Sequence, residues 1–206
     1  VVYVMSRDQR VDDNHALIAA QKYAIEKSLP LIVTFCLYQS TGHRTKEQYE
    51  FMLQGLGEVE NKLEEKNIAF HLLVGKPSQE LGSFFEESKP SVVFFDFNPL
   101  AGPRTLLDSL VESNPDISMY VVDTHNMIPC WVASDKKEFS AATFRPKVHK
   151  YFGEYLIAPD DTVNHPHDFK GKTSSIKGQQ KAIDAILDML VSTGISYDFK
   201  PGEHAA

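Results

Sequence analysis

Five short apolar runs alternate with longer amphipathic segments over the first 125 residues. The runs are Val1–Met5, Leu31–Leu37, Ala69–Val74, Val92–Phe95 and Met119–Val122. They are rich in Val, Ile and Phe and nearly continuous, which is typical of parallel strands covered on both faces. Strands that alternate with helices favour a doubly wound, Rossmann-like α/β fold. We therefore expect a five-stranded parallel sheet of order 3-2-1-4-5.

The segments between the runs have helical periodicity. In Lys46–Lys66, apolar residues fall at i, i+4, i+7 and i+11 and form one stripe, namely Met52, Leu56, Val59 and Leu63. Further helices are predicted over Asn14–Lys27, with Asp12 or Asp13 as N-cap, and over Gln79–Ser88 and Arg104–Ser113.

The pattern changes after the fifth run. We expect a short helix from about Lys136 to Ala142 and another from Pro146, in its first turn, to about Tyr155. A polar linker, Ile157–Ser174, then leads to an amphipathic helix over Lys177–Ser192. Its apolar stripe needs a partner surface and comprises Ile183, Ile186, Leu187, Leu190 and Val191. This organisation predicts an α/β domain over residues 1–157, followed by a linker and helix over 158–206.

Charge and composition exclude several classes of function. The chain has 21 Lys and Arg against 28 Asp and Glu, a net charge of −7, so it lacks the basic footprint of a nucleic-acid binder. The one basic cluster lies between Lys136 and Lys150. No apolar run approaches the roughly 18 residues of a membrane span, so no membrane partner is expected. The two cysteines, Cys36 and Cys130, are predicted to be reduced, buried thiols of a cytoplasmic protein.

Common enzyme motifs are missing from the sequence. It contains no G-x-G-x-x-G after a strand, no P-loop and no G-x-S-x-G elbow, and Gly55-Leu56-Gly57 lies within a predicted helix. Asp123, His125 and Ser134 are therefore not expected to form a catalytic triad. His165-Pro166-His167 lacks zinc-ligand spacing and is interpreted as part of a solvated linker. Trp131, the single tryptophan, is interpreted as a core residue.

Ligands of doubly wound sheets bind beyond the carboxyl ends of the strands, where the strand order reverses. The loops at these ends read Ser6–Arg10, Tyr38–Thr45, Asp96–Pro99 and Asp123–Asn126. Arg7 and Arg10 could hold an anion or a polar heterocycle, and Asp96 could accept ring N–H groups. The alternative is an ion-pair network that only fixes the loop, formed by Arg7, Asp8, Arg10 and Asp13.

Three stretches resemble one protein family. Val2–Asn14 is similar to the first strand and R-D-x-R-x-x-D-N loop of DNA photolyases. Arg44–Val59 resembles the "FMLxGLxEV" helix of their class II branch. Asp96–Leu100, Val122–Lys136 and Phe144–Lys147 complete the likeness, which covers most of residues 1–155.

The resemblance implies a light-driven flavoprotein, a carbon–carbon lyase that repairs cyclobutane pyrimidine dimers. In such proteins an N-terminal α/β domain can hold an antenna chromophore, and a C-terminal helical domain holds FAD and the flipped dimer. This chain corresponds to the first domain, so FAD belongs to the second, and the chain alone is expected to be inactive. Its expected partners are that FAD-binding helical domain and, through the full-length protein, UV-damaged DNA.

The resemblance also implies an antenna site for 8-hydroxy-5-deazaflavin or FMN. The residues matched to it are Arg7 after the first strand, Asp96 and Asn98 after the fourth, and Cys36, Leu37 and Arg44 around the second. Two other interpretations stay open: a stand-alone, non-enzymatic photolyase-like module that binds a flavin or nucleotide, and a structural remnant without a ligand.

Overall fold

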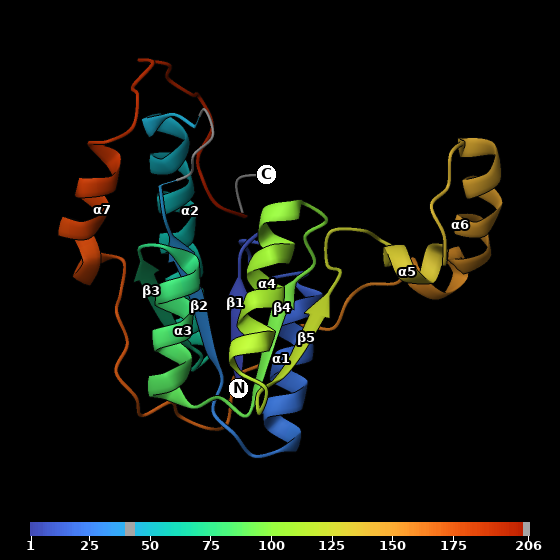
Figure 1. Ribbon diagram of the computed structural model, residues 1–206, viewed down its shortest axis with the longest axis horizontal. Helices are drawn as coiled ribbons and strands as arrows, with labels where there is room; N and C mark the ends of the chain where they lie inside the picture. Colours follow the sequence, from blue (N-terminus) through green and yellow to red (C-terminus); the bar gives the residue numbers. More distant parts are fainter. Residues whose placement is uncertain (40–43, 204–206) are drawn as a thin grey trace.

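The computed structural model describes residues 1–39 and 44–203 and contains one parallel sheet (Figure 1). Its strand order is β3-β2-β1-β4-β5, as the sequence predicts. The strands are β1 (Val2–Met5), β2 (Ile32–Leu37), β3 (Ala69–Val74), β4 (Val92–Asp96) and β5 (Ser118–Val122). Strand order reverses at β1, which pairs with β2 on one side and β4 on the other. The chain therefore leaves β1 and β4 toward opposite sides at their carboxyl ends, which is where doubly wound folds commonly bind ligands.

Helices cover both faces of the sheet. They are α1 (His15–Glu26), α2 (Lys46–Glu65), α3 (Pro77–Ser88) and α4 (Ala101–Ser113). Alternating side chains of β1 divide the core: Tyr3 and Met5 pack with α1 and α2, whereas Val2 and Val4 pack with α3 and α4. Helix α3 begins two residues before the expected Gln79, because Pro77 occupies its first turn, and α4 begins three residues before the expected Arg104.

The N-cap of α1 is Asn14 and not Asp12 or Asp13. The Asn14 side chain accepts a hydrogen bond from the backbone N–H of Leu17 at 2.9 Å. Asp13 adopts a left-handed conformation with φ 50°, which places it in the turn before the cap.

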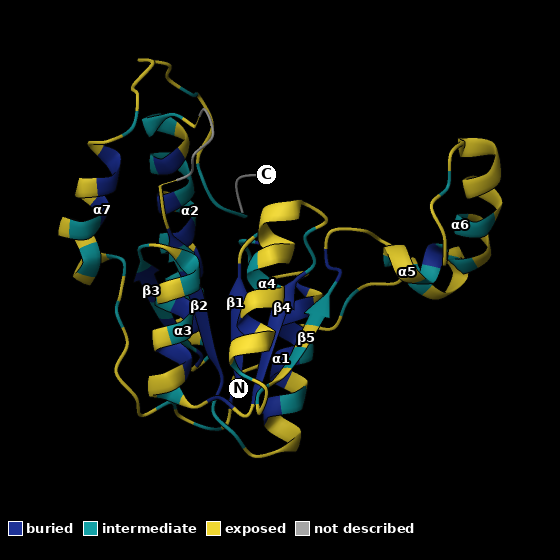
Figure 2. Ribbon diagram, in the orientation of Figure 1, coloured by how far each residue is buried: buried dark blue, intermediate teal, exposed yellow. Residues whose placement is uncertain are grey.

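The segment after β5 differs from the prediction. A short helix, α5 (Cys130–Ala133), stands where a loop was expected, and Lys136–Ala142 does not form a separate helix. The next helix, α6 (Ala141–Tyr155), begins five residues before Pro146, because Ser140 caps it by accepting from the Thr143 N–H at 3.3 Å. Together α5 and α6 project from the body of the molecule, and α6 has no buried residue (Figures 1 and 2).

Residues 160–176, which we call the strap, run along the body of the molecule; most of them are exposed, as expected of a linker, but Thr162 and His165 are buried. Gln21 on α1 exchanges two hydrogen bonds with the Val163 backbone, at 2.7 and 2.9 Å. His165 is only 1% exposed, and its Nε2 lies 2.9 Å from the Leu29 carbonyl oxygen. The solvated interpretation was wrong for His165 because this ring fills a gap beside the turn that follows α1.

The last helix, α7 (Gln180–Leu187), follows a 3₁₀ turn over Lys177–Gln179 and is shorter than predicted. Ile183, Ile186 and Leu187 are buried in the core cluster that contains α2, so the predicted stripe finds its partner within the chain. The prediction was wrong for Val191, which is 73% exposed and does not belong to the buried stripe. The helix ends early because the backbone beyond it turns to meet Glu47, which accepts from the N–H groups of Thr193 and Gly194.

The described tail returns to α2 and to the start of α1. Glu203 accepts from the backbone N–H groups of Val11 and Asp12 and pairs with Lys62. Gly55 lies on the same path, because a Cβ there would touch the Gly202 backbone nitrogen at 3.5 Å. Residues 204–206 of the predicted linker-and-helix segment lie outside the described part. Among the described residues, no helix is both long and apolar enough to cross a membrane.

Candidate functional site

A cavity of about 890 Å³ opens at the carboxyl edge of the sheet, beside the reversal of strand order. All six residues that the sequence singled out line it: Arg7, Cys36, Leu37, Arg44, Asp96 and Asn98. Residues 40–43 of the predicted loop Tyr38–Thr45 lie outside the described residues. The volume falls within the range of about 300–1,000 Å³ found for small-molecule and cofactor sites.

Asp96, the last residue of β4, organises one side of this cavity. Its Oδ2 accepts from the backbone N–H groups of the β1–α1 loop at Ser6, Arg7 and Asp8, at 2.8, 2.8 and 3.2 Å. Its Oδ1 accepts from the Tyr3 hydroxyl at 2.6 Å. The carboxylate is only 6% exposed. Most of its accepting capacity is thus used to hold the loop that carries Arg7.

A buried polar chain extends this arrangement to the start of α1. The Asn14 amide donates to the Tyr3 hydroxyl and to the carbonyl oxygens of Asp8 and Arg10, at 3.0 to 3.1 Å. Burial first, and the neighbouring Asp96 charge second, raise the pKa of Tyr3 well above its usual value. Tyr3 therefore stays a neutral donor to Asp96.

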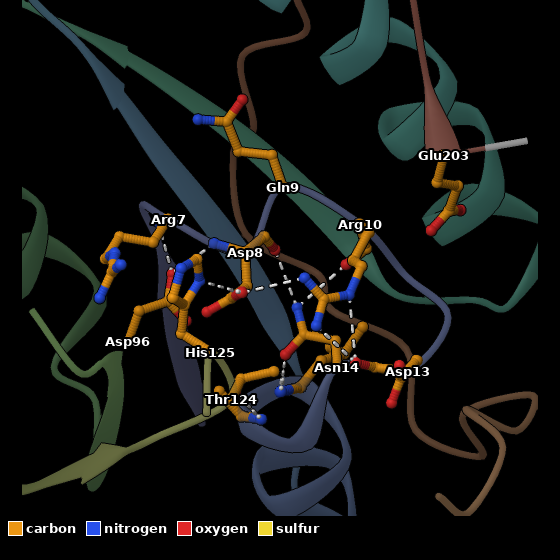
Figure 3. Close-up of polar contacts among 12 residues, drawn as sticks. Arg7, Asp8, Gln9, Arg10, Asp13, Asn14, Asp96, Thr124, His125 and Glu203 are labelled. Atoms are coloured by element: carbon orange, nitrogen blue, oxygen red, sulfur yellow. Dashed lines mark hydrogen bonds and ion pairs between the residues drawn. The ribbon is translucent and has the colours of Figure 1, made fainter. Parts of the chain in front are cut away.

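The loop is only in part the ion-pair network offered as the alternative. Arg10 pairs with Asp8 at 2.9 Å and donates to the Asp13 backbone carbonyl. Figure 3 shows Asp8 between this guanidinium and the His125 ring, whose Nδ1 is 3.7 Å from Oδ1. Arg7 does not take part, because its Nη1 donates to the Phe97 carbonyl at 3.0 Å, across the cavity edge.

Apolar side chains form the remaining walls. Phe95, Leu81 and Leu106 line the cavity together with the half-buried Cys36. Burial, and less strongly the negative charge of Glu80, raise the pKa of the Cys36 thiol to about 12. Cys36 is therefore a neutral packing group at physiological pH. The other cysteine, Cys130, is exposed, which corrects the expectation that both thiols are buried.

Sequence reasoning missed the wall supplied by the helices. Lys76, Pro77 and Ser78 at the start of α3, and Gly102–Ser109 of α4, line the cavity. The only signal was positional, since helices after β3 and β4 must begin at this edge. Trp131 also lines the cavity and is 50% exposed, not a core residue; its ring meets Phe97 edge-on at 5.2 Å.

The segment after β5 does not assemble a triad. The Asp123 carboxylate is used by Asn126 and by the Cys130 N–H, and the Ser134 hydroxyl donates to Glu138 at 2.8 Å. Within the basic cluster, Lys147 pairs with Glu138 at 2.5 Å, and the hydrogen bond from Lys147 lowers the pKa of Glu138 to about 2. These contacts hold together the projecting segment that contains α5 and α6.

Comparisons with known proteins agree with this architecture. The DNA photolyase family profile matches residues 1–166. The deoxyribodipyrimidine photo-lyase of Potorous tridactylus is 40% identical over 167 residues, which are 81% of this chain and 31% of that protein. That of Arabidopsis thaliana is 38% identical over 158 residues, 76% of this chain and 32% of that protein.

Solved structures show the same fold at low sequence identity. The archaeal photolyase from Sulfolobus tokodaii, described with two FAD molecules and a novel light-harvesting cofactor, gives a TM-score of 0.71 at 14% identity, covering 98% of this chain and 43% of that chain. A class III photolyase from Agrobacterium tumefaciens gives 0.65 at 17% identity, covering 87% and 37%. The chain spans about a third of the length of its curated relatives. It belongs to the DNA photolyase family and represents the N-terminal α/β domain of these proteins.

Proposed function

We propose that this chain is the antenna domain of a light-driven photolyase, with a flavin-type chromophore in the cavity at the carboxyl edge of the sheet. The observation that carries the proposal is the cavity itself. Its size suits a tricyclic ring, and it lies at the reversal of strand order. When bound, the chromophore would supply absorption of light.

The lining residues fit such a ring. Phe95, Leu81 and Leu106 offer apolar surface, and the neutral Cys36 adds a polarisable contact. Asp96 Oδ1 accepts only from Tyr3 among the described residues, so it retains a lone pair for a ring N–H. Arg7 stands beside it, fixed by the Phe97 carbonyl, and can donate to a ring oxygen. Leu37, Arg44 and Asn98 complete the set carried over from the family.

The activity of the full-length protein belongs to the same proposal. The relatives are named deoxyribodipyrimidine photo-lyases, which supports repair of UV-damaged DNA by the full-length protein. The class II type is proposed from the likeness of Arg44–Val59, and the cytoplasm from the scarcity of cysteines. FAD would bind in a helical domain reached through residues 158–206, and residues 1–157 would form the antenna domain. The antenna chromophore would be 8-hydroxy-5-deazaflavin or FMN.

The test is equilibrium binding of both chromophores to the purified chain, followed by absorbance. Leu106→Trp on α4 would fill the cavity, whereas Val111→Trp would place the same bulk on the same helix at a 47% exposed position outside the lining. We expect one chromophore per chain, lost in Leu106→Trp and kept in Val111→Trp. Binding that both variants retain equally would contradict the cavity as the site. No binding of either chromophore would contradict the antenna function.

A further inference from the structure

Four cationic side chains line the cavity: Arg7, Arg44, Lys76 and Arg104. Arg7 belongs to the β1–α1 loop that Asp96 holds, and its side chain donates to the Phe97 carbonyl. Arg44 directly precedes the Thr45 cap of α2, Lys76 is the N-cap of α3, and Arg104 lies in the first turn of α4. Three helices thus begin at the same edge, each with a cation at its start.

Within the described residues, none of these four cations forms an ion pair with a carboxylate. Elsewhere in the chain, Arg10, Lys62 and Lys147 each have such a partner. The carboxylates in the lining are Asp96, whose oxygens hold the β1–α1 loop, and Asp108. The lining therefore has an excess of two positive charges in a chain of net charge −7.

The helix starts add to this positive potential. The first backbone N–H groups of a helix carry partial positive charge and have no partner within the helix. At α3 and α4 no side chain of the described residues caps these groups. The first turn of α3 contains Glu80, which offsets part of its potential, whereas α4 has no acidic residue in its first turn. Unpaired cations beside uncapped helix starts are the arrangement that binds phosphate in proteins.

We infer that the chromophore of this cavity carries a phosphate, held by Arg44, Lys76 and Arg104, while its ring lies against Phe95 and Leu106. The inference rests on the proposed antenna function and narrows it to phosphorylated flavins. FMN and riboflavin share one ring system and differ only in the phosphate. The site should therefore prefer FMN, and the preference should come from these three cations.

The test compares FMN with riboflavin by equilibrium dialysis against the 206-residue chain. FMN is expected to bind at least tenfold more tightly, which corresponds to about 1.4 kcal/mol. Lys76→Gln and Arg104→Gln should each weaken FMN binding several-fold and leave riboflavin binding unchanged. Lys181→Gln, an exposed lysine on α7 outside the lining, is the matched control and should change neither. Added salt should reduce FMN binding more than riboflavin binding.

The outcomes separate the two proposals. Equal binding of FMN and riboflavin, or an FMN preference that survives both Gln variants, would overturn the phosphate site and leave the antenna function standing. Failure of FMN, riboflavin and 8-hydroxy-5-deazaflavin to bind would overturn the antenna function and this inference with it. Thermal melting of each variant checks that the fold is retained.

Discussion

Replacing Tyr3 with Phe tests the buried polar chain that shapes the site. Tyr3 is 0% exposed, and its hydroxyl donates to Asp96 Oδ1 at 2.6 Å while accepting from Asn14 at 3.1 Å. Tyr3→Phe keeps the ring and its packing but removes one hydrogen bond to a buried carboxylate. Such a bond contributes about 1.5–3 kcal/mol. The Asn14 amide retains two carbonyl acceptors, so its lost contact adds little.

The expected result is therefore a loss of about 1.5–3 kcal/mol in unfolding free energy, or roughly 3–12 °C in melting temperature for a domain of this size. Urea unfolding followed by circular dichroism measures it. Tyr120→Phe is the matched control, because Tyr120 is 49% exposed and its hydroxyl makes no hydrogen bond to the described residues. If both variants lose the same stability within about 0.5 kcal/mol, the Tyr3–Asp96 bond is not the support that we infer.

Three further predictions concern the strap, α7 and DNA. Burial lowers the pKa of His165 and of His71 below the usual 6.5, so the unfolded chain binds more protons than the native one and stability should fall as pH drops below 6.5. Urea unfolding at pH 7 and pH 5 measures this fall, which should be smaller in His165→Gln and unchanged in the exposed His15→Gln. Ile183→Ala should cost about 2–4 kcal/mol because the side chain is 2% exposed against α2, whereas Val191→Ala, at 73% exposure, should cost less than about 0.5 kcal/mol; equal costs would mean that α7 is not docked as described. The chain alone, with a net charge of −7, should bind duplex DNA weakly at physiological salt, and sub-micromolar, salt-sensitive binding in fluorescence anisotropy would contradict this expectation.

The strand order and the place of the cavity could be predicted because both follow from the apolar pattern of the strands and from the alternation of strands with helices along the chain. Continuous apolar runs such as Val92–Phe95 are hard to place anywhere but in a covered parallel strand. Once the strands are parallel, the polar residues that follow them share one edge, which predicts where the cavity lies. The six site residues were assigned from the family resemblance, and all of them line this cavity.

The roles within the site could not be predicted, because they depend on which donors tertiary structure brings together. Asp96 was expected to accept from a ligand ring, yet it mainly accepts backbone N–H groups of the β1–α1 loop, 88 to 90 residues away in sequence. Likewise, local propensity gave no sign that His165 fills a gap near Leu29 or that Trp131 reaches the cavity.

The segment after β5 was predicted least well. Pro146 suggested a helix start by its usual preference, but the Ser140 cap begins α6 earlier and the helix continues through the proline. No core packing corrects or reinforces local signals here, since α6 has no buried residue.

Trp131 offers the most direct measurement of whether the cavity holds the chromophore. It is the only tryptophan, and it lines the cavity, so a flavin bound there lies close enough to quench its emission. Titration of the chain with FMN should quench Trp131 emission in step with the flavin absorbance change, reaching saturation at one flavin per chain. Saturable flavin binding that leaves Trp131 emission unchanged would place the chromophore elsewhere and contradict the account.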